Sequence, residues 1–264
     1  RRNTGTGMWV FVLFSVLAAD ETMRHYHRGK LRKYELSAPS IMLSSGDEEV
    51  LRNGRPLMQV IVQADGRRRL LMVRDIATPG WVVMDRILDF AAYPRMIKGC
   101  DSMVPYSDKK EGRLRVMKAD YEIHAGPMNF KYYMRHEIDE HQKCMTFHLD
   151  YDRRSDLDDS VGYWFVQPTG AEQCRVYYAC DTTLRGWVPG PVYNLLGKTA
   201  LKQTTTWVNE EALKEWQKLS RKGGAGRFFS GLRRLSMPSP TPPRLPSVPK
   251  LPQLRLKPLQ QEAA

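Results

Sequence analysis

One stretch of the sequence gathers residues that could bind a cation or exchange a proton. Residues 149–159, LDYDRRSDLDD, contain five aspartates with two arginines between them. Carboxylates can act as metal ligands or as general acids and bases, but the spacing here differs from that of an EF-hand loop. Acids interleaved with bases are more typical of a solvated turn. We therefore expect a solvated turn and no metal site, formed by Asp150, Asp152, Asp156, Asp158 and Asp159 with Arg153 and Arg154.

The cysteines form no metal-binding or disulfide pattern. Cys100, Cys144, Cys174 and Cys180 include no CxxC pair, and the histidines show no metal-ligand spacing relative to them. If Cys174 and Cys180 share one extended strand, they stand ~20 Å apart, which is beyond disulfide reach. Free cysteine is commonly a core residue, so we expect four buried, inert thiols.

Signatures of the common enzyme classes are absent from the sequence. It contains no GxSxG, HExxH, P-loop or GxGxxG motif, which removes the usual hydrolase, metalloprotease and nucleotide-binding patterns. His124, beside the turn Ala125-Gly126-Pro127, could polarise a substrate, and so could Tyr121 or Tyr178. No spacing sets a base against a nucleophile, so we predict no catalytic residue and no enzymatic activity.

The elements that carry these residues are mainly strands. Residues 57–63 and 67–76 are rich in strand-forming residues and flank Ala64-Asp65-Gly66, which predicts a hairpin. Residues 101–185 break into apolar-alternating runs joined by short polar turns, which predicts a meander of about six antiparallel strands. Alternation then assigns to one apolar face Met117, Ala119, Tyr121, Ile123, Phe130, Tyr132, Met134, Met145, Phe147 and Leu149.

Two helices are predicted around these strands. The first has Thr78 as its cap and Pro79 in its first turn, and Tyr93-Pro94 ends it. The second covers residues 191–218 and ends at Gly223-Gly224. It carries an expected i,i+4 ion pair between Glu210 and Lys214. The stripe that we expect to cover the apolar face of the sheet consists of Val192, Leu195, Leu196, Thr199, Ala200, Gln203 and Trp207.

The charge of the chain is concentrated at its two ends. The 264 residues carry a formal net charge of +12. Residues 1–34 hold seven Lys or Arg and two acids, and residues 220–264 hold nine and one. The part between them is therefore close to neutral, which argues against nucleic acid as a partner and favours an anionic membrane surface for the ends.

The segments at the two ends of the chain differ in composition from the middle. Residues 8–19, MWVFVLFSVLAA, are too short to span a bilayer, so residues 1–19 are expected to be a signal-like segment, or else an uncleaved anchor or buried strand. Residues 20–56 read as a basic segment and linker. Residues 220–264 read as a basic, Pro-rich disordered tail. Its expected membrane-contact residues are Arg227, Phe228, Phe229, Leu232, Arg233 and Arg234.

The order strand, helix, antiparallel meander and long C-terminal helix resembles the START-like, or helix-grip, superfamily. Within it the chain is similar to the coenzyme Q-binding and polyketide cyclase/dehydrase lipid transport group, over residues 57–219. The resemblance rests on residues 73–100, 161–168 and 186–208, and above all on Leu88-Asp89-Phe90 with Tyr93-Pro94 and on Trp187-Val188-Pro189. The chain departs from the family at Met84, where a Trp is common, and has Trp81 instead.

The resemblance implies an α+β fold in which a curved antiparallel sheet of about six to seven strands wraps around a long C-terminal helix. An apolar cavity between sheet and helix is the expected ligand site. Plain core packing is the alternative for each residue, and a polar Gln203 in such a place needs a partner. The residues expected to line the cavity are Tyr121, Phe130, Tyr132, Met134, Phe147, Trp164, Tyr178, Leu196, Ala200, Gln203 and Trp207.

The function expected from this is non-catalytic binding and carriage of a hydrophobic ligand at a membrane surface. The ligand would be a prenylquinone such as coenzyme Q, or another lipid, with no other cofactor. The alternatives are a polyketide cyclase or aromatase-like enzyme, and an assembly or scaffold protein that binds a protein partner through the Pro-rich tail. If the chain carries a ligand at a membrane surface, we expect it to be membrane-associated. The location would be an organelle (mitochondrion or plastid) or the secretory pathway.

Overall fold

A computed structural model describes residues 23–63, 67–125, 128–186 and 188–223. Residues 220–223 of the predicted Pro-rich tail belong instead to the long helix Gly190–Gly223. The predictions made for the signal-like segment, for the tail from residue 224 on and for the six membrane-contact residues within it lie outside the described residues. So does the expected turn at Ala64-Asp65-Gly66.

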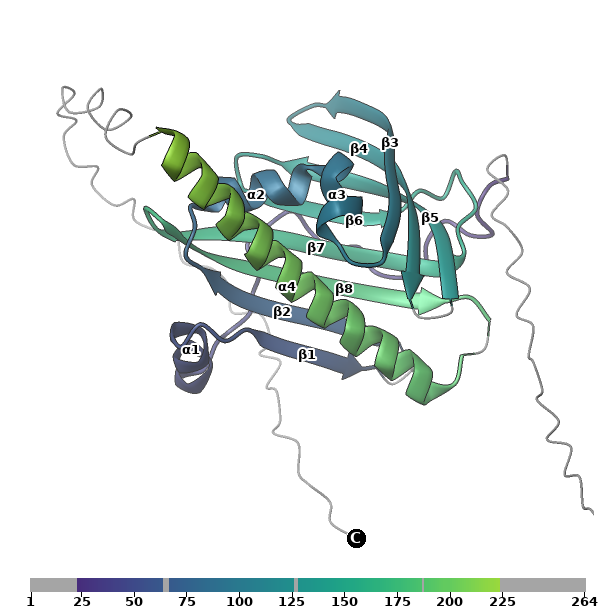
Figure 1. Ribbon diagram of the computed structural model, residues 1–264. Coiled ribbons are helices and arrows are strands. Elements are labelled where there is room, and N and C mark those ends of the chain that lie inside the picture. The colour runs from purple at the N-terminus through teal and green to yellow at the C-terminus, as the bar shows by residue number, and fades with distance from the viewer. Residues whose placement is uncertain (1–22, 64–66, 126–127, 187, 224–264) are drawn as a thin grey trace, which may run out of the picture. The chain divides into compact units, whose positions relative to one another are not determined.

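Eight strands form one fully antiparallel sheet in the order β1-β2-β8-β7-β6-β5-β4-β3, and the long helix α4 crosses one face of it (Figure 1). The expected α+β class with a curved sheet and a long C-terminal helix is confirmed. The strand count exceeds the expected six to seven because β1 and β2 both join the sheet that β3 to β8 form. The elements are α1 (Ser45–Arg52), β1 (Leu57–Val62), β2 (Arg68–Ile76), α2 (Gly80–Leu88), the 3-10 turn η1 (Phe90–Ala92), α3 (Tyr93–Met96), β3 (Cys100–Glu111), β4 (Leu114–Ala125), β5 (Met128–Asp139), β6 (Cys144–Leu149), β7 (Leu157–Gly170), β8 (Gln173–Leu184) and α4 (Gly190–Gly223).

The main hydrophobic core lies between the sheet and the helices α2, α3 and α4, on what we call the helix-covered face. Strand alternation is confirmed here: all ten residues assigned to the apolar face belong to this core or pack against it. The four cysteines are also free and buried, as expected.

The start of α2 differs from the prediction. The Thr78 hydroxyl makes no capping hydrogen bond, and it is buried with no hydrogen-bond partner. Pro79 is the N-cap residue and precedes the first helical turn. Tyr93-Pro94 does not end α2, which stops at Leu88; this dipeptide begins α3, where proline is tolerated because first-turn N–H groups have no intrahelical acceptor.

The prediction of a linker at residues 20–56 is wrong for residues 23–56, the part of it that the structure describes. Ser44 and Asp47 form a capping box that starts α1, and Leu51 of α1 is buried.

The opposite face of the sheet, which we call the outer face, has its own hydrophobic cluster. Residues preceding α1 cover it, because apolar strand residues on this face also need burial. The cluster comprises Leu51, Val73, Cys144, Tyr163 and Tyr177, with Tyr34, Leu36, Ile41, Leu43, Leu57 and Phe165 packed against it.

The aspartate cluster is not a solvated turn. Asp159 is fully buried and accepts hydrogen bonds from the backbone N–H groups of Lys30 and Leu31 at 2.6 and 2.8 Å. Asp158 binds the Lys30 ammonium at 3.1 Å, and Asp152 binds Arg28 at 2.8 Å. The acids therefore fasten the basic N-terminal segment to the end of the sheet, a contact between residues more than 120 positions apart that no local pattern reveals.

Helix α4 buries a different face from the one expected. Its buried line runs through Gly197, Leu201, Thr205, Val208 and Ala212. The reason is the close approach of Gly197, whose absent Cβ would lie 3.4 Å from Leu70 of β2 and 3.8 Å from Val60 of β1. The predicted stripe is correspondingly wrong for four exposed residues, Val192, Leu195, Thr199 and Ala200. The predicted Glu210–Lys214 pair is also replaced, since Lys214 binds Glu211 at 2.6 Å.

Candidate functional site

The helix-covered face contains a continuous series of aromatic contacts. Tyr132 of β5 stacks on Tyr121 of β4 with centroids 5.1 Å apart and planes 9° apart. Trp164 of β7 contacts Tyr178 of β8 at 4.6 Å and Trp207 of α4 at 6.0 Å. These rings span from β4 to α4, so the sheet and the helix share one aromatic layer.

At one end of this face several side chains remain half-buried although they belong to the main hydrophobic core. Phe130 and Tyr132 extend from β5, Phe147 from β6 and Leu184 from β8, and all four pack against the main core. Leu196, Gln203 and Thr204 of α4 are half-buried as well. We call these seven residues the aromatic end. Their incomplete burial contrasts with the full burial of Met72, Ile76 and Val83 elsewhere in the same core.

The structure assembles most of the residues predicted to line a cavity. Five of them are buried: Tyr121, Met134, Trp164, Tyr178 and Trp207. Five are half-buried: Phe130, Tyr132, Phe147, Leu196 and Gln203. Ala200 is exposed, because the buried line of α4 passes through Leu201.

Sequence reasoning missed His136, which lies in the middle of the aromatic layer. Its Nε2 accepts a hydrogen bond from the Tyr121 hydroxyl at 2.9 Å, and its Nδ1 faces the Met117 carbonyl at 3.3 Å. Burial lowers the pKa of His136 to about 3, and burial raises the pKa of Tyr121 well above its usual value. Both groups are therefore neutral. The same alternation that selected Met134 would have found His136 two residues later.

His124, the predicted polarising residue, does not face the aromatic end. It is exposed, and its Nδ1 lies 2.8 Å from the Asp101 carboxylate. Its neighbour Ile123 packs against the main core, so alternation along β4 directs His124 to the other face. The structure therefore separates His124 from Tyr121 and Tyr178.

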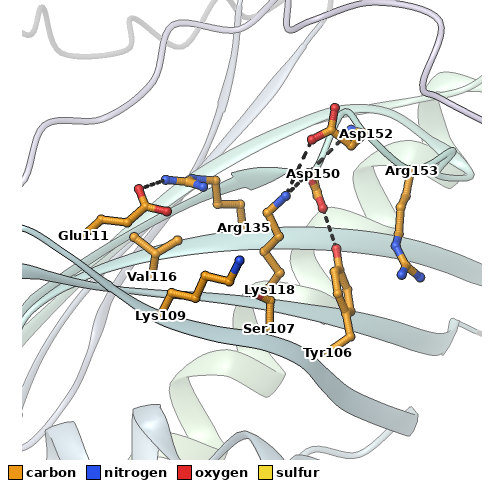
Figure 2. A pocket seen from close by; sticks show the side chains of 10 residues that line it. All are labelled: Tyr106, Ser107, Lys109, Glu111, Val116, Lys118, Arg135, Asp150, Asp152 and Arg153. Carbon is orange, nitrogen blue, oxygen red and sulfur yellow. Dashed lines mark hydrogen bonds and ion pairs between the residues drawn. The ribbon is translucent and has the colours of Figure 1, made fainter.

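A polar hollow of about 560 Å³ lies on the outer face (Figure 2). Its charged side chains are mostly paired: Lys118 binds Asp150 at 2.9 Å, and Arg135 binds Glu111 at 2.7 Å. Arg153 lies over the ring of Tyr106 with its guanidinium carbon 4.1 Å from the centroid. The Tyr106 hydroxyl donates to Asp150, and burial together with that carboxylate raises the pKa of Tyr106. These contacts join β3, β4 and β5 to one another and to residues 150–153, and they include no activated nucleophile.

A second hollow, of about 580 Å³, lies beside α2. Trp81, the residue at which the sequence departs from its family resemblance, lines it and contacts Trp216 of α4 edge-on at 6.4 Å. Met84 is buried in the main core. None of the seven residues of the aromatic end lines either of these two hollows.

Two further findings concern metal sites and membrane spans among the described residues. Within the described ranges, no three His, Cys, Asp or Glu side chains are grouped so that they could hold a metal ion. Among the helices that the structure describes, none is both long enough and apolar enough to cross a bilayer.

No protein-family model matches the chain, and no curated protein matches its sequence. Solved structures with a similar fold include a START superfamily protein from Mycobacterium smegmatis, at 13% identity and TM-score 0.49, covering 56% of this chain and 99% of that one. The ZhuI aromatase/cyclase from Streptomyces sp. R1128 matches at 12% identity and TM-score 0.48, over 60% of this chain and 98% of that one. Human STARD10 matches at 10% identity and TM-score 0.47, over 77% and 94%.

These likenesses concern the fold and carry nothing about ligand or activity. The antiparallel strand order with a long helix across one face of the sheet is the helix-grip architecture that the sequence predicts.

Proposed function

We propose that the chain binds a hydrophobic ligand at the aromatic end and carries it at a membrane surface without chemically changing it. The ligand class is a prenylquinone, such as coenzyme Q, or another lipid with a long apolar tail. One observation carries the proposal: apolar side chains on the helix-covered face of β5, β6 and β8 are left half-buried, whereas Met72, Ile76 and Val83 of the same core are fully buried. An apolar tail against them would complete their burial, at roughly 25 cal/mol per Å² of apolar surface.

The absence of a poised base supports carriage over catalysis. The Tyr121–His136 pair is the obvious proton-transfer pair of the aromatic layer, and its hydrogen bond occupies the Nε2 of a neutral imidazole. Burial and the nearby Asp101 also raise the pKa of the Cys100 thiol to about 11, which disfavours a thiolate nucleophile.

The outer side of α4 supports contact with a membrane. Val192 and Leu195 are 39% and 65% exposed, and Lys198 and Lys202 are exposed beside them. The sequence has no acid from residue 182 to residue 209. Apolar and basic side chains on one exposed helical surface are suited to anionic lipid headgroups. In this proposal the protein is membrane-associated, in an organelle or the secretory pathway.

The deciding experiment is lipid extraction and mass spectrometry of the full chain after mild purification, combined with uptake of lipid or quinone from vesicles. A co-purified hydrophobic compound that can be exchanged from vesicles is the expected result. A chain that holds no such compound and takes none up would refute the proposal. Turnover of a polyketide-like conjugated substrate would instead favour a cyclase, and loss of a protein partner on deletion of residues 224–264, with vesicle binding unchanged, would favour a scaffold.

A further inference from the structure

The polar hollow on the outer face is lined by more bases than acids. Its basic side chains come from β3, β4, β5 and the loop between β6 and β7. The bases are Lys109, Lys118, Arg135 and Arg153, and the acids are Glu111, Asp150 and Asp152. The lining of the hollow therefore has an excess of positive charge.

Three of these bases lie on neighbouring strands. Lys118 of β4 and Arg135 of β5 are direct cross-strand partners, and Lys109 belongs to β3, which pairs with β4 on its other side. Figure 2 shows the charged ends of Lys109, Lys118 and Arg135 in the same part of the hollow, whereas Arg153 lies beyond Tyr106. Like charges opposite each other in a sheet repel, so an anion placed between them would be stabilising.

Lys109 is the base of this group whose charge is not used within the fold. Lys118 binds Asp150 at 2.9 Å. Arg135 binds Glu111 at 2.7 Å. No acid in the described ranges pairs with Lys109, which lines the hollow with an exposed side chain. Its ammonium therefore offers three N–H donors to a ligand.

The acids of the hollow are each held by a partner of their own, so they do not exclude an anion. Asp150 accepts a 2.6 Å hydrogen bond from the Tyr106 hydroxyl in addition to its ion pair with Lys118. Asp152 binds Arg28, which lies outside the lining, at 2.8 Å. The charge of the third ammonium or guanidinium group is thus left for a bound molecule.

The hollow also has neutral donors and room. Ser107, the cross-strand partner of Lys118, lines it and adds a hydroxyl. Its volume of about 560 Å³ lies within the range of about 300–1,000 Å³ typical of small-molecule sites. Val116 and the ring of Tyr106 supply apolar surface beside the charges. The hollow can therefore hold an anionic group and part of the molecule that carries it.

We propose that the polar hollow binds a phosphate group, held by the Lys109 ammonium with Lys118 and Arg135 beside it. Ammonium and guanidinium groups both form charge-assisted hydrogen bonds to phosphate oxygens. The phosphate belongs either to a small phosphorylated molecule or to a lipid headgroup, which present the same oxyanion. The inference does not depend on the proposed function, because the polar hollow and the aromatic end share no residue.

The test titrates the full chain with inorganic phosphate at pH 7 and low salt, followed by phosphorus NMR. Saturable binding that weakens as sodium chloride is added is the expected result. Lys109→Gln should lower phosphate affinity about tenfold, the effect of one charge-assisted hydrogen bond, and Lys109→Arg should retain most of it. Lys110→Gln is the matched control, because it removes the same charge from the next residue of β3, which does not line the hollow.

A second arm distinguishes the two sources of the phosphate. Co-sedimentation with phosphatidylcholine vesicles, with and without phosphatidic acid, is measured for the unmodified chain, Lys109→Gln and Lys110→Gln. Weaker binding of Lys109→Gln alone to the phosphatidic acid vesicles assigns the site to a lipid headgroup. Equal vesicle binding by all three proteins, with phosphate affinity lost only in Lys109→Gln, assigns it to a small phosphorylated molecule.

Two results would overturn the inference. One is the lack of saturable phosphate binding by the unmodified chain. The other is an equal loss of affinity in Lys109→Gln and Lys110→Gln, which would reflect only the general charge of the chain. Thermal unfolding checks that the variants fold, which is expected because Lys109 is exposed and has no acid partner within the described ranges. Either result leaves lipid carriage at the aromatic end standing, and failure of lipid uptake leaves the phosphate site standing.

Discussion

The backbone N–H of Leu31 donates a 2.8 Å hydrogen bond to the carboxylate of Asp159, which is fully buried. The same carboxylate accepts from the Tyr151 hydroxyl at 2.8 Å and from the backbone of Ser160 at 2.9 Å. One aspartate thus joins the N-terminal segment to the start of β7, and a region with the composition of a basic tail becomes part of the folded domain.

Removing the Asp159 carboxylate is expected to destabilise the folded chain strongly. Asp159→Ala leaves several buried N–H and O–H donors without an acceptor, and we expect the free energy of unfolding to fall by about 3–5 kcal/mol. Asp152→Ala, at an exposed pair with Arg28, should cost under about 1 kcal/mol. Urea unfolding of both variants measures the difference. Equal effects at the two positions would contradict the role given to Asp159.

Gly162 is predicted to be intolerant of any side chain. A Cβ at this position would lie 2.0 Å from the Phe147 ring. Gly162→Ala should therefore displace that ring, which is part of the aromatic end, lower stability by about 1–3 kcal/mol and reduce lipid uptake. Adding Phe147→Leu should restore part of the stability.

The control for this prediction is Gly190→Ala at the first residue of α4, where a Cβ would meet no atom within 4 Å. Thermal unfolding and vesicle uptake are compared across the three variants. A well-folded Gly162→Ala protein with unchanged uptake would show that Phe147 can move away from the ligand space.

His136 should make stability depend on pH. Its folded-state pKa of about 3 lies below the ordinary value of 6.5, so the unfolded chain binds its proton first as pH falls. Stability is complete above pH 6.5 and decreases below it, by about 2 kcal/mol between pH 7 and pH 5. Glu137 also makes the folded chain less stable as pH falls, but only at lower pH. Hydrogen bonds from His148 and Arg135 hold its pKa to about 2.

Denaturant unfolding at pH 7, 6 and 5 tests this dependence. His136→Gln should be less stable at pH 7 and show a smaller slope, with a remainder from His25, whose pKa burial also lowers. An unchanged slope in the variant would refute the assignment to His136.

The thiols should resist modification in the folded chain. Burial raises the pKa of Cys100 to about 11 and those of Cys144 and Cys174 to about 12, and Cys180 is buried as well. We expect no labelling by iodoacetamide at pH 8 in the native protein and four labels after denaturation, counted by mass spectrometry. Val104→Cys, at a residue 54% exposed on β3, should add one label under native conditions. Fast native labelling of any wild-type cysteine would disprove the buried assignment.

Membrane contact through α4 can be tested at a single residue. Leu195→Glu replaces an exposed apolar side chain by an acid next to Lys198, so binding to vesicles containing phosphatidylserine should fall several-fold. Val104→Glu, on β3 at a residue 54% exposed against 65% for Leu195, is the matched control and should leave binding unchanged. Co-sedimentation measures both; equal losses would indicate a general charge effect.

Local sequence patterns were sufficient to predict which residues of the strands face the helices. Alternation placed Met117, Tyr121 and Tyr132 on the helix-covered face, because a strand has only two faces and a register error would move every side chain from one to the other. The same alternation also places His136 on this face, two residues after Met134.

The buried side of helix α4 was harder to predict, because the side chains of a helix point in all directions around its axis. The stripe through Leu195 and Ala200 had a reasonable period, but the buried line was set by Gly197 against Val60 and Leu70, which are over 120 residues earlier. Packing of that kind is fixed by the neighbouring strands and is not encoded in the periodicity of the helix itself.

The sequence by itself determined the antiparallel strands, the long helix, the apolar face and the buried cysteines, because these follow from alternation and composition within short stretches. Only the tertiary structure decided that apolar residues between Tyr34 and Leu51 cover the outer face, and that the aspartates fasten the N-terminal segment. Both depend on packing, ion pairs and hydrogen bonds between residues distant in the chain. Such contacts exist only once the sheet has brought the partners together.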